Sequence, residues 1–156
     1  SSSMPLQVGN KIPEFSFFDS NHKERNSKEF IGTKTLFAFF PGAFTDVCTD
    51  ELCQIGDMMD RFNDSNVKVV GISSDSPFAL NAWAVQNSIS YDLISDYNFD
   101  CIDAFGVSFV GLAGLTGYRS SNRAVFISDE DGVLIYSWEA EHPGIIPDYK
   151  AVLAHI

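Results

Sequence analysis

The stretch "TKTLFAFFPGAFTDVC", residues 33–48, places a strand, a turn and the start of a helix in immediate succession. Its first part is a nearly continuous apolar run that ends at Pro41, and such runs are typical of strands buried on both faces of a sheet. Thr45 or Asp46 can cap the helix that follows. Apolar residues then recur at helical spacing on one face, namely Cys48, Leu52, Ile55, Met59 and Phe62. The sequence therefore predicts a buried strand that leads directly into an amphipathic helix.

The same alternation of strand and helix patterns continues along the chain. The glycine-rich segment 109–121 predicts a loop or an irregular hairpin, and 122–139 predicts two strands joined by an Asp/Gly turn. Alternating strands and helices followed by a hairpin predict an α/β fold with a mixed central sheet flanked by helices. Further strands are predicted at 14–20, 66–75 and 91–96, and further helices at 76–88, 97–107 and 146–156.

Length and composition narrow the classes of protein that fit. A chain of 156 residues with 45% hydrophobic residues predicts a single domain. We place this domain at residues 4–156 and exclude the leading Ser1–Ser3. The net charge of −11 argues against binding to nucleic acids or anionic membranes, which needs a basic surface. We expect neither a membrane span, which takes roughly 20 apolar residues, nor a signal peptide. Three cysteines then fit a reducing compartment, so we expect a cytoplasmic protein.

Cys48 lies where the helix is predicted to begin. The first turn of a helix has free backbone N–H groups and the positive end of the helix dipole, and both stabilise a thiolate. The alternative is a small apolar residue on the core face of the helix, since free cysteines are commonly buried and inert. The order of Pro41, Thr45 and Cys48 at a strand-to-helix junction favours a reactive thiol.

The segment "PGAFTDVC" resembles the Pro-x-x-x-Thr-x-x-Cys signature of the peroxiredoxins, which are thiol peroxidases with a thioredoxin-like fold. "CTDELC" with "SDSPF" most resembles the peroxiredoxin Q/bacterioferritin-comigratory group and the alkyl hydroperoxide reductase E group. The resemblance covers almost the whole chain and implies a thioredoxin-like fold. Four further segments resemble the family in the expected order: "GISSDSPFALNAWA" (71–84), "LISD" (93–96), "FGV" (105–107) and "RAVFISDEDGV" (123–133).

The resemblance implies a role for each residue of the signature. Cys48 would be the peroxidatic cysteine, whose thiolate attacks a hydroperoxide and becomes a sulfenic acid. Thr45 would hydrogen-bond the substrate oxygens, and Pro41 would shield and shape the pocket. Arg123 would stabilise the thiolate and the charge on the departing oxygen. The chemistry implies a hydroperoxide substrate, a thioredoxin-like or small-thiol reductant, and no cofactor.

The charged residues around Cys48 leave alternatives open. Arg119 competes with Arg123, but it lies in the glycine-rich segment, where an exposed surface arginine is expected. Glu51 can contact an arginine or shape the pocket, whereas Asp50 is expected to be a solvated acid of the first helical turn. Unpaired carboxylates near a thiol disfavour its anion, so an arginine must outweigh them.

The cysteine that reduces the sulfenic acid is also open. Cys53 lies where peroxiredoxin Q types often place a resolving cysteine. On an intact helix the two Cα atoms would be about 8–9 Å apart, and a disulfide needs less than about 7 Å, so the bond requires the helix start to unwind. Cys101 is expected to be a structural thiol but can resolve after rearrangement, and an external thiol is the third possibility.

Other classes of function fit the residues less well. A zinc site needs about four ligands at short spacing, and the three histidines lie far from the cysteines in sequence, so we expect no metal. The Cys-x-x-Cys of a disulfide oxidoreductase is absent from the sequence. A non-enzymatic redox sensor or chaperone on the same fold is the main alternative. In the family that the chain resembles, positions such as Phe44 and Phe78 often form the pocket rim or a dimer interface, so a homodimer through that surface is a hypothesis. Trp83 is expected to be core.

Overall fold

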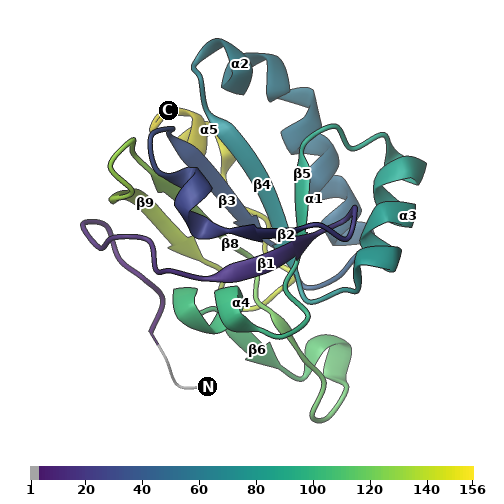
Figure 1. Ribbon diagram of the computed structural model, residues 1–156. Helices are drawn as coiled ribbons and strands as arrows, with labels where there is room; N and C mark the ends of the chain where they lie inside the picture. The colour runs from purple at the N-terminus through teal and green to yellow at the C-terminus, as the bar shows by residue number, and fades with distance from the viewer. Residues whose placement is uncertain (1–3) are drawn as a thin grey trace.

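The computed structural model describes residues 4–156, apart from the side chain of Asp46, and forms a seven-stranded mixed sheet there (Figure 1). The excluded Ser1–Ser3 lie outside this range. The strand order is β2-β1-β5-β4-β3-β8-β9. The central β3–β4 and β4–β5 pairs are parallel, and the other pairs are antiparallel. The strands are β1 (Ser16–Asp19), β2 (Glu24–Asn26), β3 (Thr35–Phe39), β4 (Lys68–Ser73), β5 (Asp92–Ser95), β8 (Ala124–Ser128) and β9 (Leu134–Glu139).

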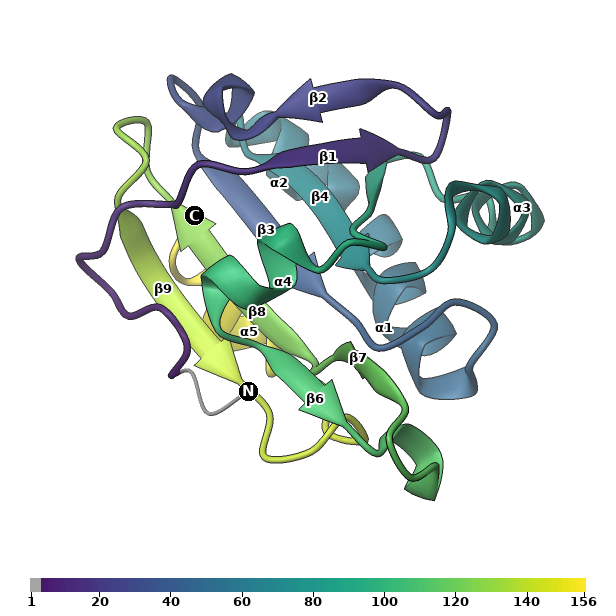
Figure 2. The same ribbon diagram turned by 60° about the horizontal axis from the view of Figure 1, so that its bottom comes forward.

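Strand β3 is buried along its whole length and divides the interior into two cores. Leu36 and Ala38 face one core, whereas Phe37 and Phe39 face the other, because successive side chains of a strand point to opposite faces. Figure 2 shows one helix crossing the near face of the sheet and other helices behind it. The near helix is α4 (Asp100–Phe105), and the far face carries α1 (Asp46–Asp57), α2 (Met59–Asp64), α3 (Pro77–Asn87) and α5 (Tyr149–Leu153).

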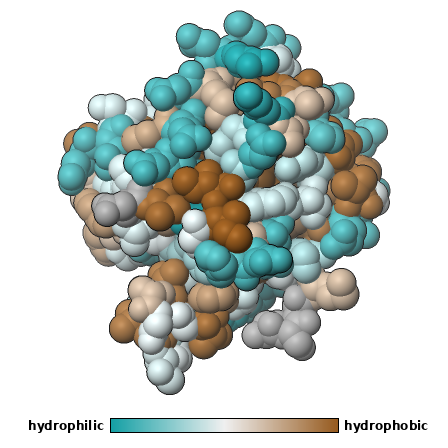
Figure 3. All heavy atoms as spheres, turned by 180° about the vertical axis from the view of Figure 1, so that it is seen from behind, coloured by the Kyte–Doolittle hydropathy of each residue, from teal (hydrophilic) through white to brown (hydrophobic). Residues whose placement is uncertain are grey.

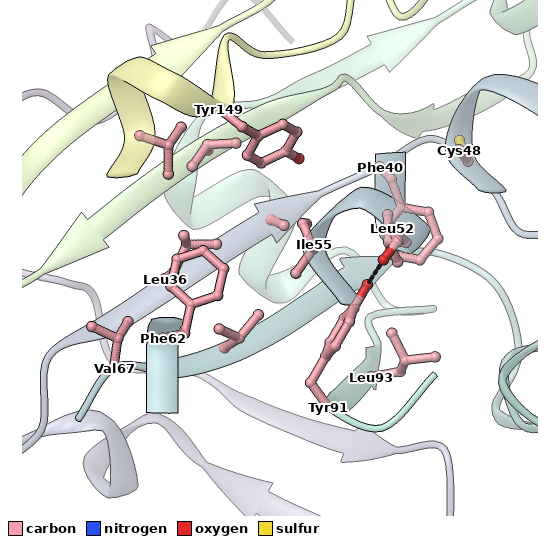
Figure 4. Packing of buried hydrophobic residues seen from close by; sticks show 14 of the residues in the cluster. Leu36, Phe40, Cys48, Leu52, Ile55, Phe62, Val67, Tyr91, Leu93 and Tyr149 are labelled. Atoms are coloured by element: carbon pink, nitrogen blue, oxygen red, sulfur yellow. Dashed lines mark hydrogen bonds between the residues drawn. The ribbon is translucent and has the colours of Figure 1, made fainter. Parts of the chain in front are cut away.

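The core under α1 is built from the apolar face that the sequence predicts. Cys48, Leu52 and Ile55 are each at most 1% exposed and pack toward β3 (Figure 4). Tyr91 lies in the same core and donates its hydroxyl to the carbonyl oxygen of Leu52 at 2.8 Å. These contacts fix the helix that carries Cys48 against the sheet.

The core under α4 is rich in phenylalanine. The ring of Phe105, on α4, lies 5.3 Å from that of Phe37 and 5.0 Å from that of Phe126. Cys101 is fully buried among these residues. Since buried aromatic pairs of this kind contribute beyond the area they bury, α4 is held firmly although it is short.

Most predicted elements are confirmed, including the Ser76 cap with Pro77 at the first turn of α3 and the 122–139 hairpin. The glycine-rich segment forms the irregular hairpin of β6 (Ser108–Val110) and β7 (Arg119–Ser121), which is separate from the main sheet. Trp83 is fully buried, as expected. In residues 4–156 no helix is long and apolar enough to span a membrane.

Three elements of secondary structure differ from the predictions. The long helix breaks at Met58, whose N–H donates to Ile55, so its apolar face is divided between α1 and α2. The terminal helix is only Tyr149–Leu153. Strand β2, missing from the prediction, has no apolar alternation; Arg25 anchors it by contacts with Asp19, Glu29 and Asp92.

A buried carboxylate caps α4, and its raised pKa makes the stability of the fold depend on pH. Asp96 accepts the N–H groups of Cys101 and Ile102 at 3.1 and 2.7 Å. Burial nevertheless raises the pKa of Asp96 from 3.8 to about 6. An acid whose pKa is higher in the folded chain contributes stability below its unfolded pKa and loses that contribution as pH rises through the folded one.

We therefore expect the free energy of unfolding of the native chain, relative to Asp96→Asn, to fall by about 3 kcal/mol between acidic and neutral pH. Urea unfolding of both proteins across this range measures the difference, in which the other titrating groups cancel. A difference that stays constant with pH would contradict the assignment to Asp96.

Candidate active site

The turn between β3 and α1 is anchored by a partly buried carboxylate from the segment that follows the neighbouring strand, β4. Asp75 Oδ2 accepts the Ala43 N–H at 2.8 Å and the Ser73 hydroxyl at 2.7 Å. Burial raises the pKa of Asp75, while both of these donors oppose the rise. Phe44 follows with a positive φ of 63°, which reverses the chain before the helix. Asp75 carries no signal for this role in the sequence, because its partner at Ala43 belongs to a different segment of the chain.

Helix α1 begins without a side-chain cap from Thr45. Thr45 has the extended backbone of an N-cap, but its hydroxyl donates to the Gly42 carbonyl at 3.0 Å. Thr45 therefore takes the predicted cap position but does not accept a helix N–H through its side chain, because the turn already uses that hydroxyl; the alternative, the Asp46 side chain, lies outside the described residues. The Thr49 N–H donates to the Thr45 carbonyl, so the N–H groups of Val47 and Cys48 precede the first backbone bond of the helix and have no partner within it.

Cys48 lies beside a buried guanidinium. Its side chain is 1% exposed, and Arg123 Nη2 donates to Sγ at 3.2 Å. Arg123 immediately precedes β8, the antiparallel neighbour of β3, so the sheet brings together two residues that are 75 positions apart. The start of the helix and the guanidinium both place positive potential on the sulfur.

Arg123 is held by two other groups. Its Nε donates to the Pro143 carbonyl at 2.8 Å, and its Nη1 forms an ion pair of 2.6 Å with Glu51 Oε1. The second oxygen of Glu51 accepts the Tyr149 hydroxyl at 2.7 Å. Burial raises the pKa of Glu51, whereas Arg123 and Tyr149 oppose that rise. Burial acts to lower the pKa of Arg123, but Glu51 and Cys48 outweigh it and raise the value.

A pocket of about 490 Å³ opens above Cys48. Arg123 forms part of its base, and the β6–β7 hairpin forms one wall with Phe109 and Leu112. Seen from behind, this hairpin projects from the lower left of the molecule (Figure 3). The pocket is lined by Pro41, Thr45, Val47, Cys48, Phe109, Gly111, Leu112, Ala113, Arg123, His142, Pro143 and Gly144. The structure thus brings Pro41, Thr45, Cys48 and Arg123 to one cavity.

The competing arginine lies elsewhere. Arg119 is exposed, pairs with Asp103 and lies with its guanidinium carbon 3.9 Å from the centre of the Phe99 ring. Asp50 is exposed, as expected of a solvated acid in the first turn. Glu51, by contrast, is fully buried and pairs with Arg123. The carboxylate that crowds Cys48 is therefore the one that the arginine neutralises.

The three cysteines are free thiols in different surroundings. Cys48 faces the core under α1, and Cys53 is half-buried on the same uninterrupted helix. Cys101 lies in the other core, and burial raises the pKa of its thiol well above the usual value. Among the side chains that the structure describes, which leave out Asp46, no three His, Cys, Asp or Glu gather as a metal site.

The family of the chain follows from its similarity to known proteins. Residues 8–137 match the AhpC/TSA family. The chain belongs to this family. It is 34% identical over 155 residues to peroxiredoxin Bcp of Escherichia coli, covering 97% of this chain and 92% of that protein. It is also 31% identical over 148 residues to alkyl hydroperoxide reductase E of Mycobacterium tuberculosis, covering 93% of this chain and 92% of that protein.

Solved structures show the same fold. The crystal structure of peroxidoxin BcpB from Mycobacterium tuberculosis matches with a TM-score of 0.83 at 24% identity, covering 96% of each chain. A peroxiredoxin-like protein from Aquifex aeolicus matches with a TM-score of 0.83 at 25% identity, covering 98% of this chain and 87% of that one. The predictions of a thioredoxin-like fold and of a thiol-dependent peroxidase with a hydroperoxide substrate and a thiol reductant are confirmed.

Proposed function

We propose that this peroxidase reduces hydrogen peroxide and organic hydroperoxides at Cys48, and that Cys53 resolves the product. The observation that carries the proposal is the 3.2 Å contact between Arg123 Nη2 and Cys48 Sγ at the base of the pocket. A buried sulfur beside a guanidinium and a helix start is the setting of a reactive thiolate rather than of an inert core cysteine.

The first step breaks the O–O bond of the hydroperoxide. The Cys48 thiolate attacks the terminal oxygen, an S–O bond forms, and the electron pair of the O–O bond leaves with the second oxygen. That oxygen takes up a proton and departs as water or an alcohol, leaving a sulfenic acid at Cys48. Arg123 and the free N–H groups of Val47 and Cys48 would stabilise the charge on the departing oxygen, and Thr45 and Pro41 would orient the substrate and exclude water.

The second step closes a disulfide. The Cys53 thiolate attacks the Cys48 sulfenic sulfur, an S–S bond forms, and the hydroxyl leaves as water after protonation. Because both residues lie on the uninterrupted α1, its first turns must unwind for the sulfurs to meet. The absence of a side-chain cap from Thr45 and the exposed Gly56 favour that unwinding. A thioredoxin-like protein or a small thiol would then reduce the disulfide.

Mass spectrometry after one equivalent of hydrogen peroxide tests this sequence. We expect a Cys48–Cys53 disulfide in the native chain, a persistent sulfenic acid at Cys48 in Cys53→Ser, and an unchanged Cys48–Cys53 bond in the control Cys101→Ala. A persistent sulfenic acid in the native chain, or a bond to Cys101, would reject Cys53 as the resolving residue. Failure to consume peroxide with any thiol would instead favour the redox sensor or chaperone.

Two further expectations belong to this proposal. We place the protein in the cytoplasm, because its cysteines are free thiols in the described chain. Phe44 and Phe78 are 54% and 71% exposed, and large exposed apolar side chains are typical of contact surfaces when they gather in a patch. Homodimerisation through the surface that carries them stays a prediction.

A further inference from the structure

The C-terminal helix contributes a side chain to the charge network of the active site. Tyr149, at the start of α5, is 7% exposed, and its hydroxyl extends from α5 toward α1 (Figure 4). It donates to Glu51 Oε2 at 2.7 Å across 98 positions of sequence. The groups facing its hydroxyl are Glu51, Tyr91 and Arg123. Nothing in the sequence pattern of the terminal helix indicates this contact.

The polar atoms of Glu51 and Arg123 are divided among different partners. Glu51 accepts from Arg123 at Oε1 and from Tyr149 at Oε2. Arg123 donates from Nη1 to Glu51 and from Nη2 to Cys48. Hydrogen bonds therefore run in one chain, from Tyr149 through Glu51 and Arg123 to the sulfur of Cys48.

This division is not the arrangement that the two charged groups would adopt alone. Arginine and carboxylate groups frequently pair through two parallel N–H···O bonds. Such a pair would draw both Nη atoms of Arg123 onto Glu51 and withdraw Nη2 from the sulfur. In the structure Oε2 accepts from the Tyr149 hydroxyl, Oε1 alone accepts from Arg123, and Nη2 of Arg123 donates to Cys48.

We propose that Tyr149 is a positioning residue for the peroxidase reaction, which keeps the Arg123 guanidinium directed at Cys48 by occupying the second oxygen of Glu51. The inference rests on the proposed role of Cys48. It makes α5 part of the active site, although no residue of α5 lines the pocket.

A comparison of two tyrosine-to-phenylalanine variants tests the proposal. Tyr149→Phe removes the donor to Glu51, whereas Tyr91→Phe removes an equally buried hydroxyl that donates to the backbone of the same helix, at Leu52. We expect the second-order rate of Cys48 with hydrogen peroxide to fall about tenfold in Tyr149→Phe and to stay unchanged in Tyr91→Phe. We also expect the pH midpoint for alkylation of Cys48 to move upward only in Tyr149→Phe. Urea unfolding should show a similar loss of stability in both variants.

A double-mutant cycle separates positioning from packing. The carboxamide of Glu51→Gln cannot form a charged fork with Arg123, so Tyr149→Phe should cost no further rate in that background. An undiminished effect of Tyr149→Phe in Glu51→Gln, or equal peroxide rates and alkylation profiles in Tyr149→Phe and Tyr91→Phe, would overturn the proposal. If the native chain does not react with peroxide at Cys48, the proposed function fails, whereas alkylation in the same variants still tests whether Tyr149 positions Arg123.

Discussion

Replacing Cys48 with serine is expected to lower peroxide turnover by at least about a thousandfold. A serine hydroxyl stays protonated near neutral pH and so does not supply the anion that breaks the O–O bond. The surroundings should remain in place, because an oxygen can accept from Arg123 Nη2 where Sγ now lies at 3.2 Å. The loss should therefore report chemistry rather than folding.

The measurement is peroxide consumption with a thioredoxin system or a small thiol, combined with trapping of sulfenic acid. Circular dichroism verifies that the variant is folded. Cys101→Ala is the matched control, because Cys101 is fully buried in the core on the other face of the sheet. We expect it to retain turnover. More than a few per cent of native turnover in Cys48→Ser would mean that another group reduces the substrate.

The parts of the fold that sequence predicted best are those in which local pattern and burial coincide. The run that forms β3 is apolar at every core position, so its central place in the sheet could be predicted without knowledge of its neighbours. The start of α3 was also predictable, because the Ser76 cap and Pro77 act within one turn. Strand β2 lacked such a signal, since it is held by Arg25 contacts that reach other elements.

The same distinction applies to the site. Cys48, Thr45 and Pro41 lie within one short motif, and Arg123 could be located because the resemblance covers the start of a core strand. Asp75 and Tyr149 had no comparable signal, since each acts on a partner from another element. Arg119 shows the converse: a plausible residue type whose partners, Asp103 and Phe99, hold it away from Cys48.

Replacing Arg123 with alanine is expected to slow the reaction of Cys48 with hydroperoxides by about a hundredfold to a thousandfold. The variant loses the donor to the sulfur and the charge that faces the departing oxygen. Stopped-flow measurement of the second-order rate with hydrogen peroxide gives the size of the effect. The rate of Arg123→Lys should lie between those of the native chain and Arg123→Ala. Lysine keeps the charge, but it cannot donate to Glu51, Cys48 and Pro143 from one planar group.

The same substitution should destabilise the fold by about 3–5 kcal/mol, because it leaves Glu51 buried without its partner. Burial already raises the pKa of Glu51, and the loss of Arg123 removes the main opposition to that rise. The folded pKa of Glu51 should therefore rise further in the variant, and stability should fall as pH rises through that folded pKa. Urea unfolding across pH measures this slope.

The double variant Arg123→Ala/Glu51→Gln separates these two effects. Removing the carboxylate together with the guanidinium should restore much of the lost stability and flatten its pH dependence, because no buried charge is left unpaired. The peroxide reaction should stay slow, since the donor to Cys48 is still missing. If the double variant regains native rate along with stability, the guanidinium serves only to neutralise Glu51, and the helix start alone activates the thiol.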